Sequence, residues 1–223
     1  MESSIKSRLF IGEKTKEIKT LIFDFGGVLI DLDKEKSVRA FSDLGIERID
    51  ELLSHWCQKG VFLDFEEGKI STEEFLDEIK KMTSRAISND EIKKAFFLFL
   101  VDLPKYKLDL ILQLRNHYQI FLLSNINELI YNYCLDEYFH KYHHTIEEYF
   151  DKIYLSFQLN ACKPKKEIFE KMLLDAAINP EETLFLEDGE QNIVTAQSFG
   201  LNTFFVKPHE DFSPLFELPI VKK

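Results

Sequence analysis

The sequence has no apolar run that approaches the roughly 20 residues needed to cross a bilayer, and its first residues lack the apolar stretch of a signal peptide. It has three cysteines, Cys57, Cys134 and Cys162, an odd number without CxxC spacing, which argues against a disulfide framework or a structural zinc site. Positive charge is scarce: 28 Lys and Arg face 39 Asp and Glu, and the net charge of −11 disfavours non-specific binding to nucleic acid. We therefore expect a cytoplasmic protein that binds neither nucleic acid nor a membrane.

Apolar residues make up 45% of the chain and charged residues 30%, a composition typical of a globular protein with a buried core. Short apolar runs recur at residues 20–23, 120–123, 153–155, 184–186 and 203–206. A continuous apolar run bounded by glycine or polar residues indicates a strand buried on both faces, the kind found in parallel sheets. Amphipathic stretches of helical length lie between most of these runs. The alternation predicts an α/β fold: a Rossmann-like, mostly parallel sheet covered by helices.

One long segment interrupts this alternation. Residues 35–104 carry no buried-strand signal and are typical of several helices, at 38–44, 49–57, 72–82 and 90–99. Ser71 and Glu74 have the spacing of a capping box, which marks the start of one of them. We therefore expect a polar N-terminal tail at residues 1–16, an α/β core at 17–34 and 105–223, and an α-helical cap inserted at 35–104.

Polar side chains follow the predicted strands at their carboxyl ends, the place where function gathers in a parallel sheet. They are Asp24 after the first strand, Ser124 and Asn125 after the second, Lys163 after a loop beyond the third, and Glu187 and Asp188 after the fourth. Carboxylates from separate strands can hold Mg²⁺, while a lysine and a hydroxyl neutralise and orient phosphate oxygens. A carboxylate in line with phosphorus can act as a nucleophile. The set indicates metal-assisted phosphoryl transfer.

Each of these residues alone has an ordinary explanation, because Asp and Ser often cap helices or turns and a single lysine is usually a solvated charge. The adjacent acids Glu187 and Asp188 are less ordinary, since two carboxylates at one strand end repel each other unless a cation lies beside them. Four such groups in strand order favour one shared site.

These residues also carry a resemblance. From about residue 21 to about residue 206 the chain resembles the haloacid dehalogenase superfamily of hydrolases. The family's first motif, a strand followed by DxDx(T/V), is similar to FDFGGVL at residues 23–29, and its second, a strand ending in Ser or Thr, is similar to LLSN at residues 122–125. Lys163-Pro164 and Glu187-Asp188 match the third and fourth motifs. The helical insertion is similar to the family's first type of cap, which closes over the site.

The resemblance implies a Mg²⁺-dependent phosphatase that hydrolyses a small phosphorylated metabolite through an aspartyl phosphate. In that scheme Asp24 is the nucleophile, and Ser124, Asn125 and Lys163 bind the phosphate, with Ser124 and Lys163 also stabilising the intermediate. The implied metal ligands are Asp24, the backbone carbonyl of Gly26, Asp188 directly and Glu187 through a water molecule.

The chain departs from this pattern at Gly26. Phosphatases of the family usually have a second aspartate there, which protonates the leaving oxygen and then activates water, whereas glycine has no proton to give. General acid catalysis typically contributes about 10²–10⁴-fold. Three interpretations remain open: the substrate has a good leaving group, Asp31 or Asp33 supplies the acid, or the protein has lost turnover and only binds.

The stretch FDFGGVLIDLD at residues 23–33 resembles more closely the subgroup that contains bacterial α-glucose-1-phosphate phosphatases. This subgroup implies turnover despite the missing acid and favours a sugar phosphate such as a hexose 1-phosphate.

Other readings are weaker. A 2-haloacid dehalogenase needs no metal, so the acidic pair argues against it, and a phosphonatase needs a buried cap lysine, for which only Lys69 beside a glycine turn is a candidate. A non-enzymatic binding module is the remaining alternative. We expect a monomer or weak dimer, and a cap that contacts substrate through some of Trp56, Phe62, Phe65 and Glu66.

Overall fold

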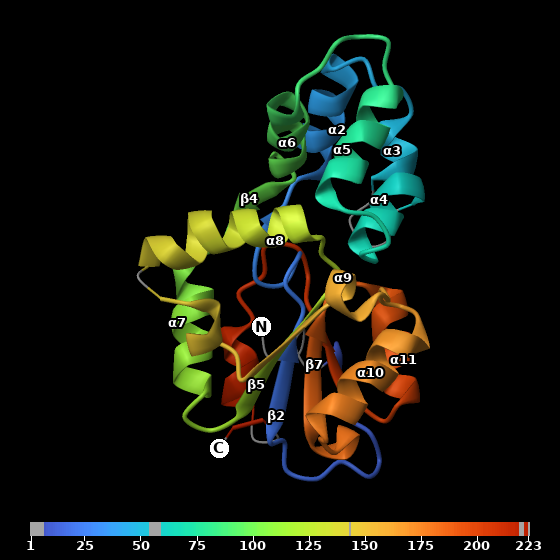
Figure 1. Cartoon of the computed structure of the whole chain (residues 1–223). Helices are drawn as coiled ribbons and strands as arrows, with labels where there is room; N and C mark the ends of the chain where they lie inside the picture. Colours follow the sequence, from blue (N-terminus) through green and yellow to red (C-terminus); the bar gives the residue numbers. More distant parts are fainter. Residues whose placement is uncertain (1–6, 54–58, 143, 219–220, 223) are drawn as a thin grey trace.

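Six strands form the main sheet, in the order β1-β8-β7-β2-β5-β6 (Figure 1). The computed structural model describes residues 7–53, 59–142, 144–218 and 221–222. The strands are β1 (Leu9–Phe10), β2 (Thr20–Phe23), β5 (Gln119–Ser124), β6 (Lys152–Leu155), β7 (Thr183–Glu187) and β8 (Asn202–Phe205). Each predicted apolar run lies in or overlaps one of β2 and β5–β8, and these five strands are parallel. The predicted α/β fold is confirmed.

Strand β2 occupies the switch point of the sheet, with β5 hydrogen-bonded on one side and β7 on the other. The carboxyl ends of these three strands therefore meet at one edge, which is where ligands bind in open α/β sheets. All four residues of β2 are buried, as expected of a strand covered on both faces.

Helices cover both faces of the sheet. Alternate β2 residues point to opposite sides. Ile22 packs in the cluster that contains Phe169 of α10 (Lys166–Ala176), whereas Leu21 and Phe23 pack in the cluster that contains Ile111 of α7 (Lys105–Leu114). The core helices are α7 (Lys105–Leu114), α8 (Glu128–Cys134), α9 (Ser156–Leu159), α10 (Lys166–Ala176) and α11 (Glu190–Ser198). A π-helical turn, η1 (Leu135–Phe139), and short 3₁₀ turns, η2 (His140–Tyr142), η3 (Ile146–Glu148), η4 (Pro180–Glu182) and η5 (Ser213–Glu217), complete the core.

Residues 7–16, the described part of the expected polar tail, contain a short strand. Strand β1 pairs antiparallel with β8 at the sheet edge, and Arg8 forms two hydrogen bonds of 2.5 Å with the Glu210 carboxylate. The Arg8 guanidinium also lies 5.0 Å from the centre of the Phe204 ring. A two-residue strand has too little periodicity to be read from sequence, so the sequence predicts only a polar tail here.

The helical cap leaves the core through β3 (Asp31–Leu32) and returns through β4 (Leu100–Asp102), which pair antiparallel. Between them lie α2 (Lys34–Asp43), α3 (Ile49–Leu52), α4 (Gly60–Glu66), α5 (Thr72–Lys81) and α6 (Asn89–Phe97), all above the sheet in Figure 1. The predicted capping box is present, since the Ser71 side chain accepts from Glu74 N and the Glu74 side chain accepts from Ser71 N. Helix α4 and the two short strands were not predicted.

The interior of the cap is built from phenylalanine rings. Phe62 lies 5.2 Å from Phe75 and 5.5 Å from Phe96, measured between ring centres, and Phe65 stacks on Phe75 at 4.4 Å. Phe62 and Phe65, both named as candidate substrate contacts, are thus core residues of the cap, while Trp56 lies outside the described residues.

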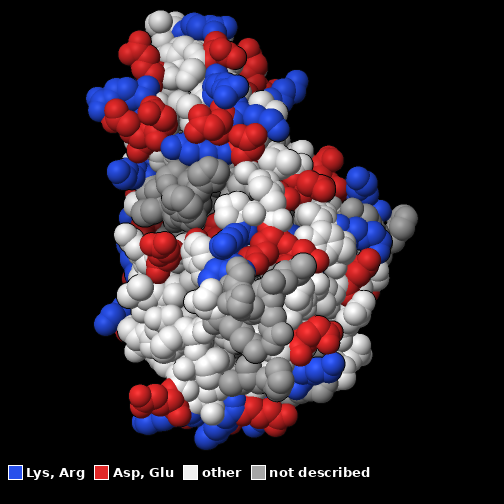
Figure 2. Space-filling model, turned by 180° about the vertical axis from the view of Figure 1, so that it is seen from behind, with Lys and Arg blue, Asp and Glu red and all other residues white. Residues whose placement is uncertain are grey.

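On the face of the molecule drawn in Figure 2, acidic and basic groups are interspersed over the cap. Within the described ranges, no helix is both long enough and apolar enough to span a bilayer.

Candidate active site

The structure brings the predicted site residues together at the carboxyl edge of the sheet, below the cap. Asp24 directly follows β2, Ser124 ends β5 and Glu187 ends β7, while Lys163 lies in the loop between α9 and α10. They line a cavity of about 70 Å³. Its other polar lining residues are Glu66, Asn125, Asn127, Asp188 and Asn192, and its apolar ones include Phe25, Leu32, Phe96, Phe99, Leu100 and Ile130.

Lys163 is the charged centre of the site. Its Nζ lies 2.8 Å from Asp24 Oδ1, 2.6 Å from Glu187 Oε2 and 3.0 Å from the carbonyl oxygen of Leu123, so its three protons all have acceptors. The side chain is 1% exposed. Burial opposes the charge on Lys163, but the neighbouring Asp24 and Glu187 carboxylates outweigh it and raise the pKa of the ammonium group above its ordinary value. Lys163 is therefore a fixed cation rather than a proton donor at neutral pH.

Three carboxylates gather beside this lysine, with ligand oxygens of Asp24, Glu187 and Asp188 within 4.8 Å of one another. Burial, with the charge of Glu187, raises the pKa of Asp24, because one lysine does not neutralise three acids in a dry site. Oxygen ligands in this arrangement suit a hard divalent cation such as Mg²⁺, whose charge would relieve the repulsion. The residues present therefore fit the metal site that the sequence predicted.

The Glu187 carboxylate accepts hydrogen bonds at both of its oxygens. Its Oε1 accepts from Gly189 N at 2.9 Å and from Asn192 Nδ2 at 3.0 Å, and its Oε2 accepts from Lys163. Although burial acts in the opposite direction, Lys163 and these donors lower the pKa of Glu187. Because both Glu187 oxygens already accept hydrogen bonds, Glu187 is better suited to contact the metal through a water molecule than to coordinate it directly. The bond from Asn192 to Glu187 depends on packing and is seen only in the structure.

The loop after Asp24 turns back on itself, with Gly27 N bonded to Ile30 O at 2.8 Å. Gly27 has a φ of +76°, and a Cβ at this position would overlap Asp188 Oδ2. Glycine is thus required here both by the backbone conformation and by the space that Asp188 occupies. Gly26, the position of the missing acid, lines the cavity and has no side chain to fill it.

Asn125 lines the cavity, and its side chain pairs with the backbone of Lys163. Its Oδ1 accepts from Lys163 N at 2.7 Å and its Nδ2 donates to Lys163 O at 2.8 Å. These two bonds position the loop that carries Lys163. The predicted contact of Asn125 with substrate stays a prediction. Ser124 is 1% exposed, and its Oγ lies 3.4 Å from Asn125 O.

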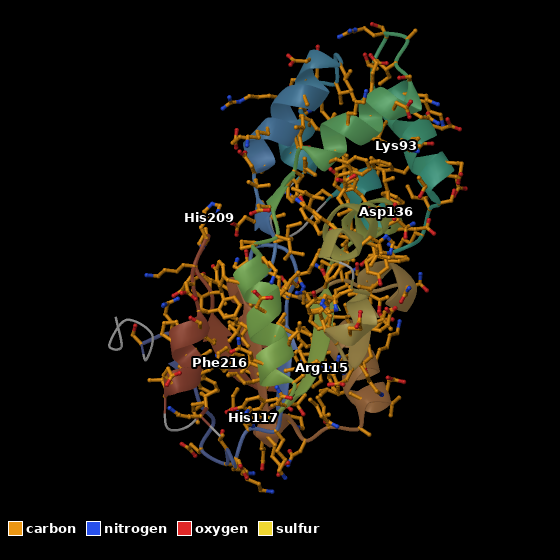
Figure 3. The ribbon with its side chains drawn as sticks, turned by 90° about the vertical axis from the view of Figure 1, so that its left-hand side faces the viewer. Lys93, Arg115, His117, Asp136, His209 and Phe216 are labelled. Atoms are coloured by element: carbon orange, nitrogen blue, oxygen red, sulfur yellow. The ribbon has the colours of Figure 1, made fainter. Side chains whose placement is uncertain are left out.

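Neither aspartate considered as a substitute acid lines the cavity. Asp33 caps α2 by accepting from Lys36 N, and this bond lowers its pKa. Asp31, in β3, pairs with Lys107 Nζ at 3.2 Å and with His209 Nδ1 at 3.1 Å. Figure 3 shows His209 at the level where the cap joins the core. These groups secure the connection and do not face the reaction site.

Among the described residues of the cap, one ionisable side chain lines the cavity, Glu66 at the end of α4. It is 7% exposed, and its Oε2 lies 3.8 Å from Cys162 Sγ. Burial raises the pKa of Glu66 from 4.5 to about 8, only partly opposed by the Cys162 contact and by the charge of Lys163. The Cys162 thiol remains protonated, because burial raises its pKa as well.

Contacts on either side of Glu66 hold the cap against the core. Ser156 Oγ lies 2.7 Å from Glu66 O and accepts from Ile126 N at 2.9 Å, which links the cap to the loop after Ser124. Glu67 forms ion pairs with Lys165 of the core and with Lys69 of the cap, although its own side chain is 1% exposed. A Cβ on Gly68 would collide with the Phe157 carbonyl oxygen, so the cap turn packs directly on α9.

Lys69, the candidate for a phosphonatase lysine, is unsuited to that role. Its side chain is 54% exposed and pairs with Glu67 and Asp64, which raise its pKa. A Schiff-base lysine needs the opposite shift.

Three comparisons place these observations among known proteins. The model of the haloacid dehalogenase-like hydrolase family matches residues 18–200. The chain is 40% identical over 187 residues to the D-ribitol-5-phosphate phosphatase of Bacteroides thetaiotaomicron, a match that spans 84% of this chain and 91% of that protein.

Two solved structures are similar over nearly their whole length. One is a haloacid dehalogenase family enzyme of Bacteroides thetaiotaomicron in complex with magnesium and inorganic phosphate, 41% identical, with a TM-score of 0.83 over 89% of this chain and 99% of that one. The other is a predicted hydrolase of the same type from Porphyromonas gingivalis, 34% identical, with a TM-score of 0.85 over 93% of this chain and 100% of that one. The magnesium in the first agrees with the cation expected from the sequence.

Proposed function

Since the chain belongs to the haloacid dehalogenase-like hydrolase family, we propose that it is a Mg²⁺-dependent phosphatase of small phosphorylated metabolites, with sugar-alcohol phosphates as the first substrate class. The single observation that carries this proposal is the position of Asp24, bonded to Lys163 Nζ at 2.8 Å and grouped with the Glu187 and Asp188 carboxylates. A nucleophile, a fixed cation and a metal-binding set in one buried cavity are the parts that phosphoryl transfer needs.

The residues divide the work as follows. Asp24 attacks phosphorus and forms an aspartyl phosphate, while Lys163 keeps the attacking carboxylate charged and balances the phosphate oxygens. The Ser124 hydroxyl, at the end of β5, donates to a phosphate oxygen. Asp24, Asp188 and the Gly26 carbonyl hold the cation, with Glu187 acting through water. Bound there, Mg²⁺ supplies charge stabilisation for the transferring phosphoryl group.

The choice of substrate class rests on the D-ribitol-5-phosphate phosphatase of Bacteroides thetaiotaomicron, to which this chain is 40% identical. A second candidate is a hexose 1-phosphate. The observation that favours it is Gly26. The anomeric oxygen of a sugar is a better leaving group than the alkoxide of a primary alcohol, so its departure depends less on a general acid. The two candidates differ in leaving group and can be separated by direct comparison.

The test is phosphate release from both classes, pentitol 5-phosphates and hexose 1-phosphates, with Mg²⁺ and with excess chelator. We expect turnover that requires the cation and is faster with the pentitol esters. Asp24→Asn, which keeps the size of the side chain, should abolish release while the protein remains folded. Release that survives this substitution would disprove the proposed nucleophile. A wild-type protein that binds these esters but releases no phosphate would instead support a binding module.

A further inference from the structure

If the substrate is a primary alkyl ester, as the proposed function holds, the leaving alkoxide needs a proton that Gly26 cannot supply. The described residues that line the cavity include five with ionisable side chains: Asp24, Glu66, Lys163, Glu187 and Asp188. Four of these form one group: Lys163 pairs with Asp24 and Glu187, and the carboxylates of Asp24, Glu187 and Asp188 lie together. Glu66 is the exception, because it comes from the cap.

The position of Glu66 is fixed from two sides. Its backbone oxygen lies 2.7 Å from Ser156 Oγ in the core, and Gly68, two residues on, packs against the Phe157 carbonyl. Its carboxyl group has Cys162 Sγ at 3.8 Å as a hydrogen-bond partner, and a thiol is a weak donor. Cys162 directly precedes Lys163, so the carboxyl lies beside the residue that holds the nucleophile. It therefore shares the cavity with the reacting groups without belonging to the metal-binding set.

We propose that Glu66 is the general acid of the reaction and donates its proton to the ester oxygen that leaves phosphorus. When Asp24 Oδ forms its bond to phosphorus, the bond to the ester oxygen breaks, and the Glu66 proton passes to that oxygen to give a neutral alcohol. Glu66 is then a carboxylate. The alcohol leaves and Glu66 takes a proton back from solvent, while water attacks the aspartyl phosphate, which releases inorganic phosphate and one proton to solvent and restores Asp24.

The charge state of Glu66 agrees with this role. The groups that face it are Cys162, a neutral thiol, Lys163, whose charge favours the carboxylate, and Glu67, whose charge disfavours it. Burial outweighs Lys163, and with a pKa of about 8 most of the carboxyl is protonated at pH 7. An acid that carries its proton at the working pH is what the first step needs.

Because Glu66 belongs to the cap, this arrangement also joins catalysis to cap closure. Glu66 lines the cavity in a structure in which the turn at Gly68 packs on α9, so we expect hydrolysis of a poor leaving group to require this contact between cap and core. An acid at position 26 would have stayed in the core with the nucleophile. The proposal thus assigns to the cap a chemical step as well as a role in covering the site.

The experiment compares two leaving groups in one enzyme. Glu66→Gln keeps the shape of the side chain and removes the transferable proton. We expect its kcat to fall by about 10²–10⁴-fold on a pentitol 5-phosphate and to stay close to wild type on p-nitrophenyl phosphate, whose phenolate leaves without protonation. Asp64→Asn is the matched control: it removes a carboxyl from the same helix, at a side chain 48% exposed to solvent, and should change neither rate.

The second readout is the pH profile. The wild-type kcat on the pentitol ester should fall as pH rises through the region near 8. The kcat on p-nitrophenyl phosphate should show no such fall. Equal losses on both esters, or a rise in KM with kcat unchanged, would overturn the proposal in favour of a binding role for Glu66. A wild-type protein inactive on both esters would contradict the proposed function instead. Activity on p-nitrophenyl phosphate shows that the variant is folded.

Discussion

Asn125 and Lys163 are joined by two hydrogen bonds, in which the Asn125 side-chain amide pairs with both the N–H and the carbonyl oxygen of Lys163, at 2.7 and 2.8 Å. A side chain directly after β5 thus fixes the backbone that carries the Lys163 ammonium group. The Asn125 amide thus satisfies the backbone N–H and C=O of Lys163, which in a strand would be paired with a neighbouring strand.

Asn125→Ala removes both bonds and leaves two backbone groups to find other partners. We expect the free energy of unfolding to fall by about 1–3 kcal/mol, as measured by urea titration. We also expect kcat to fall by about 10²-fold, because a displacement of Lys163 misplaces Asp24. Asn116→Ala is the control, since Asn116 is exposed and bonds only the nearby Gln113 and Leu112 carbonyls. Unchanged kcat in the Asn125 variant would show that Lys163 does not depend on this contact.

Gly27→Ala should weaken metal binding specifically. The new Cβ would overlap Asp188 Oδ2, so the Asp188 carboxylate has to move. The alanine must also adopt the φ of +76° that the glycine has, a conformation that side chains disfavour. We expect a higher Mg²⁺ concentration at half-maximal activity, with kcat partly recovered when the cation is in excess. Gly12→Ala is the control, because the Cβ there would meet its nearest neighbour at 3.5 Å, an ordinary contact. An unchanged Mg²⁺ requirement would mean that Asp188 does not bind the metal directly.

The sequence was sufficient for the parts of the fold that have long, regular signals. Apolar runs located the five parallel strands, and the Ser71–Glu74 capping box located the start of α5. Strands β1, β3 and β4 have two or three residues each and leave no detectable period, so β1 was placed in a tail and the connection to the cap was missed.

The site was predictable where it follows strand ends and not where it depends on packing. Asp24, Ser124, Glu187 and Asp188 were named from that rule, and Lys163 from the loop beyond the third strand. The engagement of Asn125 with Lys163, and the difference between Phe65 inside the cap and Glu66 in the cavity, depend on which way neighbouring side chains point. Adjacent residues on a helix face different directions, and sequence alone does not say which direction is inward.

The contact between cap and core can be measured through Glu67 and Lys165. A double-mutant cycle with Glu67→Gln and Lys165→Met should give a coupling energy of about 0.5–3 kcal/mol in kcat/KM, because the buried Glu67 carboxylate loses its partner from the core. The exposed pair Lys81 and Glu78, within α5, is the control, and its coupling in kcat/KM should be negligible. Additive effects of Glu67 and Lys165 would show that this ion pair does not hold the cap closed.

Glu66 also makes stability depend on pH. Its pKa is about 8 in the folded protein, against an ordinary value of 4.5, so between these values the folded state keeps a proton that the unfolded state releases. The contribution of Glu66 to stability is therefore complete below pH 4.5 and declines as pH rises, by up to about 1.4 kcal/mol per pH unit, until pH 8. Urea unfolding in chelator at pH 5.5, 6.5 and 7.5 should show this decline in the wild type and a shallower slope in Glu66→Gln. Asp64→Asn should keep the wild-type slope. Parallel slopes in wild type and Glu66→Gln would mean that Glu66 is ionised in the folded protein, and the carboxyl would then have no proton to give at neutral pH.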